Sequence, residues 1–239
     1  MNTIKINPVQ ARMVAHRGVS GLEPENTNAA FVAAGNRSYF GIETDVHRTL
    51  DGKFVCIHDD STKRVAIDNL TVEESTFDTL RALRLCDRDG QKDRSDLRIP
   101  TLQEYVRICK KYDKIGVLEL KNTFSPEDVE KIIGIISDEE YLQGIIFISF
   151  SLENMKILRS LLPEHPCQFL TSKYTDDLAD ILTENRLDLD IYYPELNAER
   201  IALLHSKGIQ VNCWTCNDPD IAAKLIQWGV DYITTNILE

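Results

Sequence analysis

Residues 41–59 of this chain read GIETDVHRTLDGKFVCIHD and combine a strand, a turn and a returning strand. Apolar and acidic residues alternate at its start, and the two-residue period of a strand places Glu43 and Asp45 on the same face. Asp51-Gly52 is a hairpin signal, and the apolar run after it brings His58 back beside the end of the first strand. Two carboxylates and an imidazole are therefore expected to lie close together.

This acidic strand face has two interpretations. Alternating acidic residues on a strand are more often a solvated edge, where water separates the like charges. The hairpin favours a site instead, because it returns His58 to the same place. Two hard carboxylate oxygens suit a divalent cation, and His58 would then be free for proton transfer. The stretch is half of a candidate site, and the other half must come from elsewhere in the chain.

Eight apolar, strand-like runs recur along the chain, at residues 13–15, 42–46, 115–120, 144–149, 167–170, 189–193, 209–214 and 232–234. Most are separated by helical patterns. Strands this apolar have no wet face, so the alternation indicates a parallel sheet covered by helices, either closed as a (β/α)₈ barrel or open and doubly wound. Eight units favour the closed TIM barrel. No G-x-G-x-x-G turn follows the first strand, which removes the main signature of the open dinucleotide-binding alternative.

Start signals place helices in the gaps between these runs. A capping box begins at Thr101, and Ser125 and Asp218 each precede a proline at the first helical position. Further helices are expected to open at Ser151, Thr175 and Asn197. The expected helices cover residues 102–112, 127–137, 151–161, 175–185, 197–206 and 219–228, with Gly208 just beyond a helix end.

Residues 59–100 break this alternation. The stretch is polar and charged, and one short helix is expected from the capping box at Thr71 to about Arg84. Because it follows the second strand, this small insertion would lie over the barrel mouth as a lid or binding element, and residues 87–96 would be its most mobile part. We expect residues 1–239 to form a single barrel domain.

The composition limits the possible partners and the compartment. A net charge of -11 argues against nucleic acid or an anionic membrane as the main partner. The sequence has no signal-peptide pattern and no apolar run long enough to span a bilayer, and its six cysteines lie mostly among apolar residues. We therefore expect a cytoplasmic protein with buried free thiols. Cys213 and Cys216 have redox spacing, but they bracket a strand end, which disfavours a thiol oxidoreductase.

The carboxyl ends of the strands carry the other candidate residues, because barrel active sites form there. His16 and Arg17 end the first strand, Glu119 and Lys121 end the third, and Trp214 ends the seventh. Taken singly, each has a simpler explanation: Glu119 and Lys121 as a strand-end ion pair, His16 as a core histidine and Trp214 as packing.

Convergence of these residues on one mouth favours a site. Glu43, Asp45 and Glu119 could supply three oxygen ligands to a metal. Arg17 and Lys121 could supply two positive charges to a bound anion. His16 and His58 would remain, and two imidazoles flanking a phosphate are what acid–base cleavage of a phosphodiester requires.

The other three histidines do not join this group. His47 shares the parity of Asp45 and could approach the mouth, but a turn position is the simpler interpretation. His165 and His205 lie near expected helix ends and are predicted to be exposed.

Seven motifs in register give the chain a family resemblance. They are Ala15-His16-Arg17-Gly18, Pro24-Glu25-Asn26-Thr27, Glu43-Thr44-Asp45-Val46, Asp51-Gly52, His58-Asp59, Ile99-Pro100-Thr101-Leu102 and Glu119-Leu120-Lys121. Together they resemble the glycerophosphodiester phosphodiesterase family, and weaker matches continue through Trp214-Thr215, Gly229-Val230-Asp231 and Thr234. The resemblance spans nearly the whole chain.

The resemblance implies a TIM barrel that hydrolyses small-molecule glycerophosphodiesters to sn-glycerol 3-phosphate and an alcohol. It implies Mg²⁺ or Ca²⁺ on Glu43, Asp45 and Glu119, and His16 and His58 as the acid–base pair. It further implies Arg17 and Lys121 on the phosphate, Asn26 bonding a ligand or capping a helix, and Trp214 lining the alcohol pocket. Water or a neighbouring substrate hydroxyl could be the nucleophile.

Two departures from the family pattern bear on specificity. Thr62 stands where leucine is usual before Arg64, and Asn236 stands where an acidic residue is common after the last strand. Two alternatives remain on the same barrel: a phospholipase D-like or C-like lyase that leaves a cyclic phosphate, and a non-catalytic barrel that binds phosphate esters. The second would be expected to lack a carboxylate or a histidine of the set, and this chain has them all.

Overall fold

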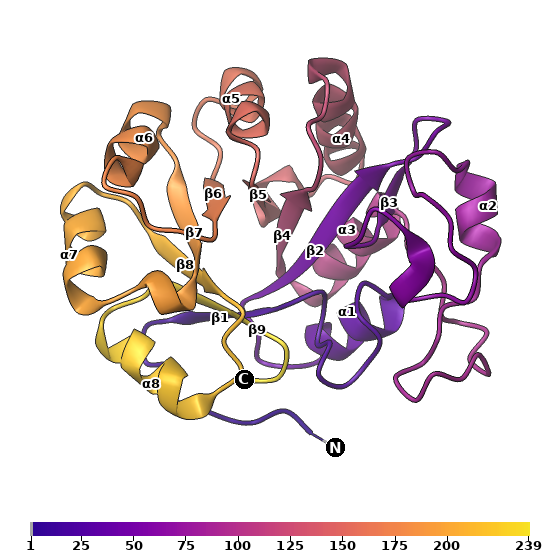
Figure 1. Cartoon of the computed structure of the whole chain (residues 1–239), viewed down its shortest axis with the longest axis horizontal. Helices are drawn as coiled ribbons and strands as arrows, with labels where there is room; N and C mark the ends of the chain where they lie inside the picture. Colours follow the sequence, from indigo (N-terminus) through magenta and orange to yellow (C-terminus); the bar gives the residue numbers. More distant parts are fainter. Residues whose placement is uncertain (1) are drawn as a thin grey trace.

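The computed structural model describes residues 2–239 and forms a closed parallel barrel. The eight barrel strands run in the order β1-β9-β8-β7-β6-β5-β4-β2, and pairing of β1 with β2 closes the ring. The strands are β1 (Arg12–Ala15), β2 (Gly41–Arg48), β4 (Ile115–Leu120), β5 (Ile145–Ser149), β6 (Cys167–Thr171), β7 (Asp188–Tyr192), β8 (Val211–Trp214) and β9 (Tyr232–Thr235). All eight predicted strands are present, so the closed barrel is confirmed and the open sheet is wrong (Figure 1).

Helices cover the outside of the barrel, as expected when both faces of a strand are buried (Figure 1). They are α1 (Asn28–Gly35), α3 (Leu102–Tyr112), α4 (Pro126–Asp138), α5 (Leu152–Leu161), α6 (Leu178–Asn185), α7 (Ala198–Ser206) and α8 (Pro219–Gln227). The capping box at Thr101 is present, and Ser125, Ser151, Asn197 and Asp218 each accept a hydrogen bond from the first turn of the helix they precede.

One of these helices begins later than predicted. The start at Thr175 is wrong, because the Leu178 N–H donates to the Thr175 carbonyl in a turn that precedes α6. Asp177 is the residue before the helix, and its side chain makes no capping bond. The predicted stop at Gly208 holds, since Gly208 has a φ of +76° two residues beyond the end of α7.

A hairpin follows β2 and positions His58. Strand β3 (Phe54–Cys56) pairs antiparallel to β2, with Val46 opposite Cys56. The connection is longer than two residues: the Gly52 N–H donates to the Thr49 carbonyl, and Gly52 has a φ of +74°, the left-handed conformation that glycine adopts without a Cβ clash.

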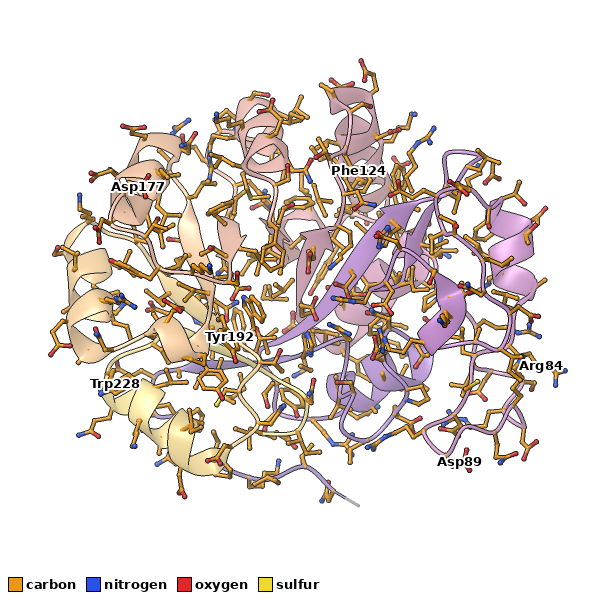
Figure 2. The ribbon with its side chains drawn as sticks, in the orientation of Figure 1. Arg84, Asp89, Phe124, Asp177, Tyr192 and Trp228 are labelled. Atoms are coloured by element: carbon orange, nitrogen blue, oxygen red, sulfur yellow. The ribbon has the colours of Figure 1, made fainter. Side chains whose placement is uncertain are left out.

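The segment between β3 and α3 has a small apolar core of its own. Its buried members are Val55, Ile57, Ala66, Val72, Leu80, Leu85, Leu97 and Ile99. The segment contains a 3₁₀ turn, η1 (Thr62–Arg64), and a short helix, α2 (Phe77–Ala82). Figure 2 shows Arg84 and Asp89, which belong to it, at the periphery of the molecule.

The helix predicted from Thr71 is wrong in its start and its capping box. Thr71 forms an antiparallel bridge with Ser61, and Val72 is fully buried in the small core. Residues 72–75 instead form a turn, in which the Ser75 N–H donates to the Val72 carbonyl. Burial of Val72 therefore outweighs the local helix signal.

The insertion contacts loops at the carboxyl ends of the strands. Arg94 pairs with Glu23 at 2.6 Å in the loop after β1, and Asn122 in the loop after β4 donates to Glu73 at 2.7 Å. Residues 87–96 are thus attached to the barrel through Arg94, and their mobility stays a prediction. Among residues 2–239, no helix combines the length and apolar character needed to cross a bilayer.

Candidate active site

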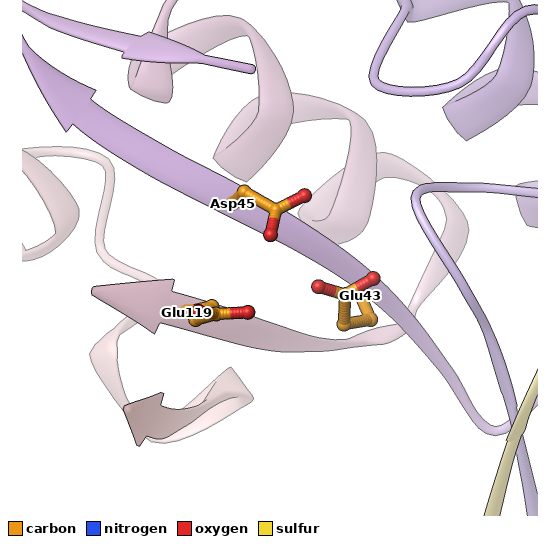
Figure 3. Close-up of side chains that lie close together, drawn as sticks. All are labelled: Glu43, Asp45 and Glu119. Carbon is orange, nitrogen blue, oxygen red and sulfur yellow. The ribbon is translucent and has the colours of Figure 1, made fainter. Parts of the chain in front are cut away.

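Strand register brings the three predicted carboxylates together. Asp45 of β2 lies directly opposite Glu119 of β4, and Glu43 lies two residues before Asp45 on the same face. One carboxylate oxygen from each residue lies within 4.8 Å of the other two (Figure 3). Because β1 pairs with β2 and β2 with β4, the strand adjacency that the predicted site requires is confirmed.

These carboxylates are buried, and their negative charges repel one another. Burial, followed by the Asp45 charge, raises the pKa of Glu119 to about 8. Burial and Asp45 likewise raise the pKa of Glu43 well above its ordinary value. Burial also opposes ionisation of Asp45, but the charges of Lys121 and Arg17 outweigh it and hold the pKa of Asp45 below its usual range.

The carboxylate cluster fits a hard divalent cation. Asp45 Oδ1 and Glu119 Oε1 are buried without a hydrogen bond of good geometry, although Lys121 Nζ lies 3.5 and 3.0 Å from them. Unpaired buried oxygens of like charge are costly, and an oxygen-seeking cation would relieve both the repulsion and the missing contacts.

The turn after β1 holds Arg17 in an unusual backbone conformation. Arg17 has a φ of +54°, and its N–H donates to Glu43 Oε2 at 2.7 Å. The next residue, Gly18, has a φ of +73°, and a Cβ there would lie 2.6 Å from the backbone carbon of Ala30 in α1. Close packing of the turn on α1 therefore requires glycine, and it aims the Arg17 amide at the carboxylate cluster.

Both predicted cations lie beside the cluster. Arg17 Nε lies 3.7 Å from Asp45 Oδ2, and Arg17 Nη1 donates to Glu25 Oε1 at 2.9 Å. Lys121 is also largely buried and approaches Asp45 and Glu119. In this arrangement the two positive charges balance part of the carboxylate charge and remain next to the place where an anion would bind a metal.

His16 is held by the last strand end. Its Nδ1 donates to Asn236 Oδ1 at 2.7 Å, and its Nε2 lies 4.0 Å from Glu43 Oε2. Burial, followed by the nearby Arg17 charge, lowers the pKa of His16 to about 4. Ser20 also donates to Asn236 Oδ1, at 2.8 Å, so the amide is fixed from two sides.

His58 is held by a chain of charged groups. Its Nδ1 donates to Asp59 Oδ1 at 2.6 Å, and Arg64 Nε donates to Asp59 Oδ2 at 2.8 Å. Arg64 also makes two bonds to Glu25, which in turn accepts from Arg17. Burial lowers the pKa of His58 below its ordinary value, against the opposing charge of Asp45.

Sequence reasoning missed the supporting roles of Glu25, Asp59, Arg64 and Asn236. Asp59 and Glu25 stand inside quoted motifs next to predicted site residues, so their proximity to the site was readable. For Arg64 and Asn236 the sequence indicates only a departure from the family pattern at or near each residue and not a supporting role, because only the folded insertion and the closed barrel bring them to His58 and His16.

Asn26 lies behind the cluster rather than against the pocket. Its Nδ2 donates to Asp45 Oδ2 at 2.7 Å, and its Oδ1 accepts from Thr44 Oγ1. The adjacent Thr27, not Asn26, caps α1. The side chain predicted to touch a ligand thus fixes the orientation of a carboxylate.

A cavity of about 190 Å³ opens at this end of the barrel. Its wall includes both histidines, Arg17, Glu43 and Glu119 on one side, and Trp214, Ile148 and Leu170 on the other. A larger cavity of about 470 Å³ lies at the opposite end of the strands, lined by Arg12, Asp188 and Tyr232. The smaller cavity is the candidate active site, because two carboxylates of the cluster, Glu43 and Glu119, line it together with both histidines.

The remaining histidines and the cysteines lie outside this cavity. His47 is fully buried and bonds the His58 carbonyl through Nε2 at 3.2 Å. His165 is buried and bonds the Ile145 carbonyl, so its predicted exposure is wrong, whereas His205 is exposed as expected.

All six cysteines are free, and burial raises the pKa of both Cys213 and Cys216, which opposes thiolate chemistry.

Comparisons with known proteins agree with this geometry. The profile of the glycerophosphoryl diester phosphodiesterase family matches residues 16–239. YhdW of Bacillus subtilis is 32% identical over 235 residues, covering 94% of this chain and 93% of the relative. A glycerophosphodiester phosphodiesterase of Caldanaerobacter subterraneus subsp. tengcongensis is 28% identical over 230 residues, covering 94% and 93%. A phosphodiesterase from Oleispira antarctica, solved in complex with the product sn-glycerol-3-phosphate, superposes with a TM-score of 0.84 at 26% identity, covering 95% of this chain and 93% of that one.

Proposed function

The chain belongs to the glycerophosphoryl diester phosphodiesterase family, and from this premise we propose that it hydrolyses glycerophosphodiesters to sn-glycerol 3-phosphate and an alcohol. One observation carries the proposal: two buried carboxylates, two histidines and a cation line a single cavity, and a third carboxylate, Asp45, and a second cation, Lys121, lie directly beside them. The product bound to the Oleispira antarctica phosphodiesterase supports this choice of reaction.

Glu43, Asp45 and Glu119 would hold one divalent cation, Mg²⁺ or Ca²⁺. Their donor set is three carboxylates, which both ions accept. Once bound, such an ion supplies Lewis-acid polarisation of a phosphoryl oxygen. Asn26 and the Arg17 amide keep two of the ligands in place, through Asp45 Oδ2 and Glu43 Oε2.

Arg17 and Lys121 would neutralise the phosphodiester. Both lie within 4 Å of the carboxylate cluster, so an anion beside the cluster would lie within their reach. A guanidinium can contact two phosphate oxygens at once, whereas an ammonium acts as a compact charge. Buried charges aimed at the developing oxyanion stabilise the transition state more than the same charges would in water.

His16 and His58 would carry the protons. Each ring is fixed through Nδ1, by Asn236 and by Asp59, which leaves its Nε2 for the substrate. One histidine removes the proton of the attacking oxygen, which forms a bond to phosphorus as the bond from phosphorus to the alcohol oxygen breaks. The other protonates that leaving oxygen. The attacking oxygen belongs to water or to a neighbouring substrate hydroxyl.

Trp214 would line the pocket for an organic part of the substrate.

We further propose that the protein works in the cytoplasm. All six of its cysteines are free, including Cys86, which is only partly buried. Free thiols persist in a reducing compartment and tend to pair in an oxidising one.

A coupled assay for released glycerol 3-phosphate, run on several glycerophosphodiesters with and without chelator, tests the proposal. We expect release that stops with chelator and returns with Mg²⁺ or Ca²⁺. In ¹⁸O-labelled water, label in the glycerol 3-phosphate supports hydrolysis. A cyclic phosphate as the final product would favour the lyase alternative, and binding without any turnover would favour the non-catalytic barrel.

A further inference from the structure

Asp190 of β7 is a buried acid that the proposed mechanism does not use. Its side chain is 1% exposed, and its Oδ1 is buried without a hydrogen-bond partner. Within residues 2–239, no hydrogen bond or ion pair to its carboxyl group is present. A buried carboxyl group without a partner is rare in proteins, because its lost hydration is not replaced.

Trp214 presents a second unpaired polar group to the same space. Its indole Nε1 is buried without a partner, although the ring itself packs against Phe150 and Tyr192. Asp190 lies opposite Asn212, and Trp214 follows Asn212 by two residues on β8, so both side chains point to the barrel interior. Both also line the cavity that contains His16 and His58.

Neighbouring polar side chains inside the barrel are paired with one another. Asn212 Nδ2 donates to Gln168 Oε1 at 3.0 Å, and Thr234 Oγ1 donates to Asn212 Oδ1 at 3.2 Å. These three residues come from β6, β8 and β9, on both sides of β7. The barrel therefore satisfies its other interior polar groups here and leaves Asp190 and Trp214 directed at the cavity.

The two unpaired groups have the chemistry that recognises a hydroxyl. The indole N–H can only donate. Burial raises the pKa of Asp190 well above its ordinary value, which favours the neutral carboxyl group, and a neutral carboxyl group can both donate and accept. A hydroxyl complements this pair, since it accepts one hydrogen bond and donates another. Ile148 and Leu170 in the same wall suit the carbon chain that carries it.

We propose that Asp190 and Trp214 form a hydroxyl-binding subsite that selects the glyceryl arm of the diester. This inference rests on the proposed function, and it divides the cavity into a reacting side at β1, β2 and β4 and a selecting side at β7 and β8. A site built to hydrogen-bond a hydroxyl rejects the analogue that lacks it, because its polar groups would then stay unpaired.

A pair of chromogenic diesters tests the subsite. Glyceryl p-nitrophenyl phosphate and n-propyl p-nitrophenyl phosphate share a leaving group and differ in two hydroxyls. We expect the protein to prefer the glyceryl diester by about 100-fold or more in kcat/KM. In Asp190→Leu and Trp214→Phe this ratio should fall at least tenfold, and Asp190→Asn, which keeps a donor and an acceptor, should retain part of it. Asp188→Asn, at the far end of the same strand and lining the other cavity, is the matched control and should keep the full ratio.

Calorimetry measures ligand affinity at the subsite without requiring turnover. The protein should bind sn-glycerol 3-phosphate at least tenfold more tightly than n-propyl phosphate, and Asp190→Leu should remove that difference. Circular dichroism confirms the fold of each variant. If Asp190→Leu does not fold, Trp214→Phe replaces it in the binding comparison. A binding preference without turnover would overturn the proposed function and leave the subsite standing. Equal binding of both ligands, or an unchanged ratio in both variants, would overturn the subsite.

Discussion

The two sides of the barrel mouth differ in the residues they present to one cavity. The charged side, formed by β1, β2, β4 and the hairpin end at His58, presents carboxylates, cations and imidazoles. The neutral side, formed by β5–β8, presents Ile148, Phe150, Leu170 and Trp214, with Asp190 as its one acid. In the functions proposed above, one barrel separates the reaction from substrate selection by placing them on different strands.

The largest effect is expected from the proton carriers on the charged side. His16→Ala and His58→Ala should each lower kcat by about 10³-fold, because a positioned acid or base contributes that order of rate. The measurement is steady-state turnover of a glycerophosphodiester, with thermal unfolding to confirm the fold. His205→Ala, an exposed histidine outside the cavity, is the control. Normal turnover in either cavity variant would remove the two-histidine mechanism.

A smaller effect is expected from the carboxylates of the same side. Glu43→Gln should raise the metal concentration needed for half-maximal activity by about 100-fold, since it removes an anionic ligand. Titration of the chelated protein with Mg²⁺ and with Ca²⁺ measures this. The exposed Glu164 supplies a control of the same chemistry in Glu164→Gln. An unchanged metal requirement in the Glu43 variant would exclude it from the ligand set.

The pH dependence of metal binding should follow Glu119. Because the pKa of Glu119 is raised to about 8, the metal-free protein holds a proton there that binding must release. Apparent affinity should rise with pH between 6 and 8, by about tenfold per pH unit from Glu119 alone and more steeply because the pKa of Glu43 is also raised. Calorimetry in buffers of different ionisation enthalpy counts the released proton.

The same shift makes the metal-free fold less stable as pH rises. Between the ordinary glutamate value near 4.5 and the folded value near 8, the folded chain binds a proton that the unfolded chain has lost. The Glu119 contribution to stability therefore declines through this window. Constant metal affinity from pH 6 to 8 would contradict both statements.

The smallest effect is expected on the neutral side. Phe150 is 44% exposed and packs edge-on against Trp214, with ring centroids 5.7 Å apart. Phe150→Leu should raise KM about two- to threefold and leave kcat nearly unchanged, because it removes apolar contact but no charge. A loss of kcat as large as that of the histidine variants would contradict the proposed division of the cavity into a reacting side and a selecting side.

The charged side was predictable from sequence and the neutral side was not. Glu43, Asp45 and Glu119 stand at strand ends with a period of two, so the strand pattern alone indicates their shared face. Asp190 lies inside a run predicted only as a strand, and nothing local distinguishes it from a solvated aspartate. The role proposed for Asp190 depends on which side chains around the barrel interior are already paired, and only the closed barrel determines this.

Errors in the predicted elements have the same physical origin. The helix expected from Thr71 fails because Val72 packs into a core formed by residues up to 27 positions away. His165 was expected in solvent, yet its ring packs at a tilt against Phe147 and bonds the Ile145 carbonyl. Local sequence patterns predict the periodicity and the caps of helices and strands well. Long-range packing decides where the structure departs from those local predictions.

The hydrogen bond between His16 and Asn236 has a consequence for synthesis of the chain. A ribosome releases residue 16 long before residue 236, and β1 pairs with β9 only after nearly the whole sequence has emerged. Until then, one edge of β1 has no neighbour and the ring of His16 has no acceptor. The nascent polypeptide can thus complete the candidate active site only as one of its last folding events, and an unpaired strand edge favours aggregation until then.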